Sequence, residues 1–147
     1  MALLARLQRE REMALVLITH DLALVAEYAQ RVAVMYAGQV LETAPVPALF
    51  DAPRHPYTAA LLAAMPERSE GATQLANIPG VVPGLYDRPA GCLFAPRCDY
   101  ATAHSQAVRP GLREWQGGWV RCHHPQGDPA REANIALHGR LAEVVSA

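Results

Sequence analysis

The alternation of hydrophobic and polar positions in the first part of the chain predicts a helix, a strand and a second helix. Apolar residues recur on one face of residues 3–12, which indicates the end of a helix. The continuous apolar run Met13–Ile18 is typical of a strand buried on both faces, as in a parallel sheet covered by helices. Asp21 follows this run and is a suitable N-cap for a helix that begins at Leu22.

The next segment predicts a β-hairpin and a further helix. Residues 32–35 are rich in β-formers, residues 40–42 provide a return strand, and Gly38 marks the turn between them. Pro56 suits the first position of a helix. The order of elements predicts the late part of an α/β domain. A single buried strand cannot close such a sheet, so more strands should precede residue 1, or another structure should cover the exposed face.

After Met65 the chain becomes rich in proline and glycine, which predicts a small irregular extension. Within it, Trp115 and Trp119 flank a Gly-Gly pair, which indicates a hairpin that packs the extension. The last segment could form one short helix around Ile135, Leu137, Leu141 and Val145. The sequence therefore divides into residues 1–65, an extension over residues 66–127 and a tail over residues 128–147.

Composition and charge exclude some functions. Of the 147 residues, 51% are hydrophobic and the net charge is −1, which suits a packed core and argues against a nucleic-acid partner. No apolar run approaches the roughly 20 residues of a membrane span, and the first residues lack a signal peptide pattern. We therefore expect a soluble cytoplasmic protein. All 13 basic residues are arginine. Without lysine there is no phosphate-binding P-loop, which requires Gly-Lys-Ser/Thr.

Three cysteines are the strongest candidates for chemistry in the extension. Cys92, Cys98 and Cys122 have the spacing C-x5-C and C-x23-C, which by itself is a weak metal signal. An odd number of cysteines in a cytosolic chain argues against a disulfide framework. Metal ligation and simple burial remain open. Arginines 88, 97 and 121 flank the cysteines; they either screen negative charge there or belong to the solvated surface.

Several segments resemble one protein family. Residues 15–22, Leu-Val-Leu-Ile-Thr-His-Asp-Leu, resemble the switch-histidine strand and loop of ABC ATPases, and residues 35–42 are similar to the hairpin that follows it. His-Pro-Tyr-Thr at residues 55–58 resembles the last helix of the peptide-importer branch. Residues 78–98, with Ile-Pro-Gly-Val-Val-Pro-Gly and Gly-Cys-Leu-Phe-Ala-Pro-Arg-Cys, resemble the C-terminal extension of dipeptide/oligopeptide ATP-binding subunits.

The resemblance implies the C-terminal part of a P-loop-type ABC nucleotide-binding domain, in a subunit that binds ATP and Mg²⁺ and energises peptide uptake. It implies that His20 is the switch histidine, which would contact the γ-phosphate and the attacking water. The chain has no P-loop, no Leu-Ser-Gly-Gly signature and no strand ending in Asp-Glu, so we predict that it does not hydrolyse ATP alone. The implied partners are two transmembrane permease subunits, a second ABC ATP-binding subunit and an extracytoplasmic peptide-binding protein. The implied location is the cytoplasmic face of the inner membrane.

The family's extension has four cysteines, which in some members hold an iron–sulfur cluster. Cys92, Cys98 and Cys122 match three of them, and the remaining position is Ser105. The candidates are therefore a four-iron cluster in which His104, His123 or His124 substitutes for the missing cysteine, or a three-iron cluster held by three cysteines. A zinc site completed by one neighbouring histidine, and no metal at all, are the other two. The alternative functions are a stand-alone metal-binding module and an inactive remnant.

Overall fold

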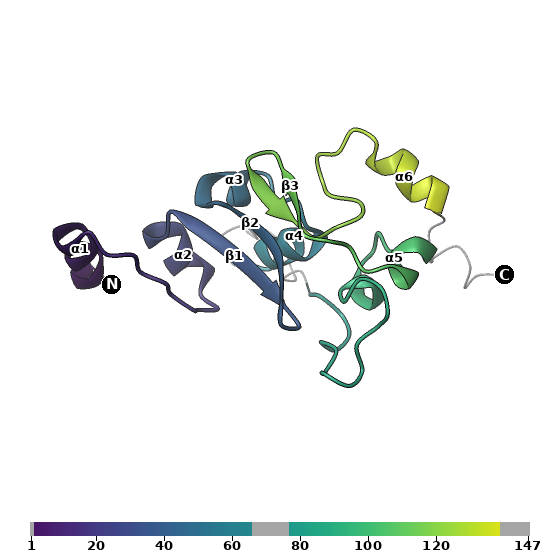
Figure 1. Cartoon of the computed structure of the whole chain (residues 1–147), viewed down its shortest axis with the longest axis horizontal. Coiled ribbons are helices and arrows are strands. Elements are labelled where there is room, and N and C mark those ends of the chain that lie inside the picture. Colours follow the sequence, from purple (N-terminus) through teal and green to yellow (C-terminus); the bar gives the residue numbers. More distant parts are fainter. Residues whose placement is uncertain (1, 66–76, 139–147) are drawn as a thin grey trace.

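The computed structural model describes residues 2–65 and 77–138, and its elements form one mixed α/β arrangement (Figure 1). The elements in chain order are α1 (Ala2–Arg11), α2 (Leu22–Tyr28), β1 (Arg31–Tyr36), β2 (Gln39–Pro45), α3 (Val46–Asp51), α4 (Pro56–Ala63), the 3₁₀ turn η2 (Ala95–Arg97), α5 (Ala103–Ala107), β3 (Arg113–Trp115), β4 (Gly118–Val120) and α6 (Arg131–His138). Within these described ranges, no helix has the length and apolar character needed to cross a membrane.

A four-stranded antiparallel sheet with the order β1-β2-β4-β3 forms the centre of the fold. The predicted hairpin around Gly38 is confirmed as β1–β2, with Tyr36 opposite Gln39. Its two turn residues, Ala37 and Gly38, both have positive φ, at 47° and 78°. Positive φ at both central residues is the mark of a two-residue turn whose twist matches that of the strands.

The predicted tryptophan hairpin is confirmed as β3–β4, and it joins the first hairpin in one sheet. Thr43 of β2 pairs with Trp119 of β4. The close approach requires a glycine, because a Cβ on Gly118 would lie 2.3 Å from the Thr43 carbonyl oxygen. The sheet therefore contains strands from both the first part of the chain and the extension.

The prediction of a buried strand at Met13–Ile18 is wrong. These residues have no regular secondary structure, and the side chains of Val16 and Ile18 are 87% and 95% exposed. A parallel strand buried on both faces needs neighbouring strands on its edges and helices over its faces. The sheet that the described residues form is antiparallel and is built from later strands, so it offers this segment no neighbour. The helix expected before it is confirmed as α1.

An aromatic cluster joins the first hairpin, α4 and the extension. The ring of Tyr36 in β1 contacts those of Tyr57 and Phe94 edge to face, with centroids 4.8 and 5.4 Å apart. Leu41 and Leu93 are buried beside it. Each aromatic pair contributes about 0.5–1.5 kcal/mol beyond area burial, so this cluster is a main attachment of the extension.

Arginine side chains hold the irregular part of the extension by its backbone. The guanidinium of Arg97 donates to the carbonyls of Ile78 and Pro79, at 2.6 and 2.7 Å. Arg88 donates to the Ala37 carbonyl at 2.8 Å, and Arg121 donates to the Val40 and Pro110 carbonyls at 2.9 and 3.2 Å. These three arginines therefore connect loops to the sheet through backbone hydrogen bonds. The charge of Arg121 also opposes the rise in the pKa of Cys92 that burial causes, whereas Arg88 is exposed at the surface, so each role considered from sequence applies to one of the three.

The tail helix is confirmed over its first part as α6. Ile135 is completely buried, and the guanidinium of Arg131 stacks on the ring of Tyr100 with 3.9 Å to the centroid. Leu137 is 79% exposed and therefore does not share the buried face. Leu141 and Val145 lie outside the described residues.

Candidate functional site

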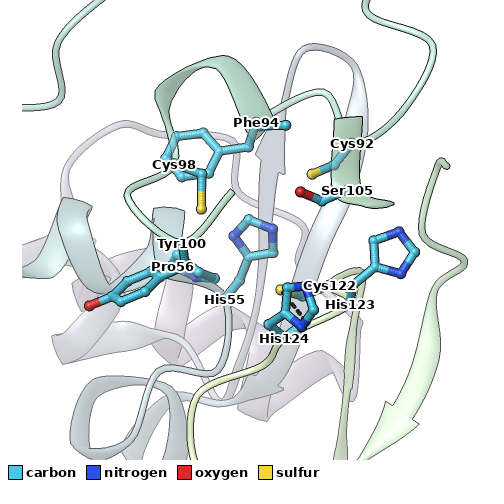
Figure 2. Close-up of a pocket in the computed structure, with 11 residues that line it drawn as sticks. His55, Pro56, Cys92, Phe94, Cys98, Tyr100, Ser105, Cys122, His123 and His124 are labelled. Atoms are coloured by element: carbon cyan, nitrogen blue, oxygen red, sulfur yellow. Dashed lines mark hydrogen bonds between the residues drawn. The ribbon is translucent and has the colours of Figure 1, made fainter. Parts of the chain in front are cut away.

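The three cysteines of the extension line one small cavity, which Figure 2 shows with its surrounding side chains. Cys92 and Cys98 lie before and after η2, and Cys122 follows β4. The cavity has a volume of about 20 Å³. A space of this size holds about one water molecule. Its other lining residues are His55, Pro56, Phe94, Ala95, Tyr100, Ser105, His123 and His124.

Burial keeps the three cysteines protonated. It raises the pKa of Cys98 and of Cys122 to about 12, and the neighbouring thiols add to the effect, while backbone N–H groups oppose it. One of these is the His124 N–H, which lies 3.3 Å from the Cys122 sulfur. Burial also raises the pKa of Cys92. Thiolates are the nucleophilic and metal-binding form of cysteine, so the raised pKa values disfavour that form at neutral pH.

His55 brings an imidazole into the same cavity (Figure 2). It is the N-cap of α4, and its Nδ1 accepts a hydrogen bond from the Tyr57 N–H at 3.0 Å. Because Nδ1 is an acceptor, the neutral ring carries its proton on Nε2. Burial lowers the pKa of His55 to about 3, opposed by the Arg121 backbone. The side chain is 1% exposed, and its buried Nε2 makes no hydrogen bond to the part of the chain that the structure describes.

A buried carboxylate fixes the position of His55. Glu42 in β2 is 1% exposed and accepts hydrogen bonds from the backbone N–H groups of Arg54 at 2.8 Å and His55 at 2.9 Å. Hydrogen bonds to an ionised acceptor are stronger than those between neutral groups. The strand thus determines where α4 begins and where the imidazole lies.

Ser105 lines the cavity together with the three cysteines and is hydrogen-bonded to Thr102. Its hydroxyl donates to the Thr102 carbonyl at 2.9 Å and accepts from the Thr102 N–H at 2.8 Å. The Thr102 hydroxyl in turn accepts from the Ser105 N–H at 3.1 Å and lies 3.2 Å from Nε2 of His124. This reciprocal pair is a capping box at the start of α5.

The described residues contain no ready arrangement of ligands for the expected metal. Among residues 2–65 and 77–138, no group of three or more His, Cys, Asp or Glu side chains is arranged to hold a metal ion. The expectation of an iron–sulfur cluster or zinc at Cys92, Cys98 and Cys122 therefore finds no support, although the three side chains do meet at one cavity. His123 and His124 also line it, whereas His104 lies outside, with its ring 4.5 Å from that of His123.

His20 lies apart from this cavity, in the exposed segment between α1 and α2. Asp21 is confirmed as the N-cap of α2, where its carboxylate accepts from the Leu24 N–H at 3.0 Å. The assignment of His20 to a phosphate contact stays a prediction.

The sequence reasoning missed His55, Glu42 and Thr102 as parts of the site. The signal for Glu42 was its acidic side chain directly after the apolar pair Val40-Leu41 in a predicted strand. A buried charge of this kind needs partners, and it often marks a structural connection. No comparable signal identified Thr102, because its role depends on the start of a short helix.

Comparison with known proteins relates the chain to proteins of peptide transport. Residues 41–104 match the family described as the C-terminal region of the oligopeptide/dipeptide transporter. The chain is 57% identical over 130 residues to the dipeptide transport ATP-binding protein DppD of Escherichia coli, and to DppD of Shigella flexneri. It is 52% identical over 132 residues to DppD of Haemophilus influenzae. Each match covers 88% of this chain and 40% of the relative.

These matches confirm the resemblance seen in the motifs. The chain matches a C-terminal portion of ABC transporter ATP-binding proteins that serve peptide import. It spans about 40% of the length of the curated relatives that it matches.

Proposed function

We propose that this chain is the C-terminal part of the ATP-binding subunit of an ABC importer that takes up dipeptides or oligopeptides. The observation that carries the proposal is the 57% identity to a dipeptide transport ATP-binding protein over 88% of the chain. The family match over residues 41–104 supports the same transport class. The alternatives, a stand-alone metal-binding module and an inactive remnant, have no comparable support.

In this proposal the subunit acts at the cytoplasmic face of the inner membrane. Its partners are two transmembrane permease subunits, a second ATP-binding subunit and an extracytoplasmic peptide-binding protein. Residues 1–65 contribute the end of the ATPase domain, residues 66–127 its extension and residues 128–147 a tail. No part of the chain supplies a P-loop, because the sequence contains no lysine. ATP and Mg²⁺ are therefore held mainly by the portion of the subunit that lies outside these residues.

His20 is the catalytic contact in this proposal. It lies in an exposed segment, where its imidazole is accessible to a nucleotide bound by another part of the assembly. An imidazole N–H can stabilise charge that grows on a transferring phosphoryl group. The apolar residues Val16 and Ile18 next to it are equally exposed, which supports the view that this segment has a packing partner in the complete subunit.

The proposal is tested by uptake of a radiolabelled dipeptide in cells that carry the complete ATP-binding subunit. We expect deletion of the region encoding these residues to abolish energy-dependent uptake and His20→Ala to reduce it severely. The matched control is Glu27→Gln, which changes an exposed residue of α2 and should leave uptake unchanged. Uptake that persists after the deletion, in cells without another dipeptide transporter, would contradict the proposal.

A further inference from the structure

The residue at the position of the family's fourth cysteine, Ser105, already uses its hydroxyl in hydrogen bonds within the protein. Ser105, at the position where the resembled family has a cysteine, is buried with 6% exposure and faces the cavity with Cys92 (Figure 2). Its hydroxyl makes one donated and one accepted hydrogen bond with the Thr102 backbone. To replace a thiolate as a ligand of iron or zinc, the serine oxygen would have to lose its proton, and here that proton is donated to the Thr102 carbonyl at 2.9 Å.

The same network extends through Thr102 to a second candidate ligand. The Thr102 side chain is completely buried, and its hydroxyl lies 3.3 Å from the Ser105 hydroxyl and 3.2 Å from Nε2 of His124. Turning Ser105 or His124 toward a metal would leave buried polar groups of Thr102 without their partners. Buried polar groups that are left unsatisfied destabilise the folded state.

The backbone around Ser105 leaves little room for rearrangement. The Cys92 N–H donates to the Ser105 carbonyl at 2.8 Å. Beside it, a Cβ on Gly91 would lie 2.3 Å from the carbonyl oxygens of Ser105 and Gln106. The start of the cysteine segment and α5 are therefore in direct backbone contact, and the space they enclose with the other lining residues is about 20 Å³.

We propose that the extension of this chain folds around a metal-free pocket, in which the Ser105–Thr102–His124 hydrogen-bond network replaces the metal ligation that the family's fourth cysteine would complete. The extension does not rely on a metal for its attachment, because the aromatic cluster, the arginine contacts and the β2–β4 pairing already join it to the sheet. A structural metal is required where such contacts are too few. This inference concerns the pocket alone and does not depend on the transport proposal.

The test is the metal content of the complete subunit, purified without oxygen and again after incubation with ferrous iron and sulfide, or with zinc alone. Iron, zinc and acid-labile sulfide are measured for the natural sequence and for Ser105→Cys, which restores a fourth thiol. We expect the natural sequence to contain well under one metal ion per chain and to keep its melting temperature in a strong chelator. We expect Ser105→Cys to acquire iron and sulfide together with their visible absorption.

Stoichiometric iron or zinc in the natural sequence, or a melting temperature that falls in chelator, would overturn the proposal. If neither protein takes up metal, the role assigned to Ser105 is wrong. Ser105→Ala gives an independent measurement because it removes the network without adding a ligand. It should lower the melting temperature of the subunit by roughly 2 °C or more if the network stabilises the fold, and an unchanged melting temperature would contradict that role. Dipeptide uptake is not a readout here, so failure of this inference is distinct from failure of the proposed function.

Discussion

The carboxylate of Glu42 accepts a hydrogen bond from the backbone N–H of His55 at 2.9 Å, so that a strand of the central sheet determines where α4 begins. The second oxygen accepts from the N–H of Arg54 at 2.8 Å. Through His55 this connection reaches the cysteine cavity, whose first cysteine lies much further along the chain. The buried charge is therefore a link between the sheet and the extension.

We expect Glu42→Ala to lower the free energy of unfolding by about 1–3 kcal/mol, because two buried N–H groups lose their acceptor. The measurement is the midpoint of urea unfolding followed by circular dichroism. Glu114→Ala is the matched control, since Glu114 is an exposed residue of β3. Equal midpoints for the two variants would show that the carboxylate contributes nothing to stability.

Gly91 should not tolerate a side chain. A Cβ at this position would lie 2.3 Å from two backbone oxygens of α5, so Gly91→Ala forces the helix and the cysteine segment apart. We expect a loss of about 1–3 kcal/mol in unfolding free energy. Gly111→Ala is the control, because a Cβ there meets no atom within 4 Å. If the Gly91→Ala variant were as stable as the Gly111→Ala variant, the close approach would be disproved.

Cys98 and Cys122 should react slowly with alkylating reagents in the folded protein. Their pKa is raised to about 12 by burial, so at pH 8 only about one side chain in ten thousand is a thiolate. We expect modification by iodoacetamide to be far faster in urea, where the thiols regain a pKa near 9. Mass spectrometry after timed quenching gives the rate at each cysteine. Equal rates with and without urea would argue against burial.

The same shifts predict that stability falls in alkaline solution. Folding raises the pKa of both thiols, so the folded state holds more protons than the unfolded state between about pH 9 and pH 12. Stability from these groups is fully present below pH 9 and is lost as the pH rises through this window. The Cys98→Ala, Cys122→Ala double variant should show a weaker decline, measured by urea unfolding at each pH. An identical decline would assign the effect to other groups.

The lowered pKa of His55 predicts that the stability of the fold also falls in acid solution. Folding lowers the pKa of this side chain from 6.5 to about 3, so the unfolded state binds its proton first as the pH falls. The contribution of the neutral His55 side chain to the stability of the fold is therefore present above pH 6.5 and is lost as the pH falls toward 3. His55→Asn keeps a side chain that can cap α4 but does not titrate. The stability difference between the natural protein and this variant should therefore shift in favour of the variant from pH 7 to pH 4; a constant difference would contradict the shift.

Local signals predicted much of the fold. The two hairpins were predictable because each depends on a short turn with glycine, and α4 because Pro56 suits the first position of a helix. The pairing of β2 with β4 was not predictable, because Thr43 and Trp119 are far apart in sequence and nothing in either strand specifies the other. The run Met13–Ile18 has the composition of a buried strand, but composition cannot supply the neighbours that such a strand requires.

The candidate site was predictable only in part. The cysteines were recognisable by type and by their resemblance to a family motif, and they do meet at one cavity. The bonding of Ser105 and the entry of His55 depend on how α4, α5 and the sheet pack together. Those contacts decide whether the thiols are ligands or simply buried side chains, and no pattern in the sequence encodes them.

The pairing of β2 with β4 has a mechanical consequence. Cys122 comes two residues after the end of β4 and moves with the sheet, because the intervening Arg121 N–H also donates to the Leu41 carbonyl at 2.7 Å. Cys92 is attached instead to α5, through the Ser105 carbonyl. The cavity thus lies between the sheet, which positions Cys122, and α5, which positions Cys92. A spectroscopic label placed in the cavity would therefore report any rotation of α5 against the sheet.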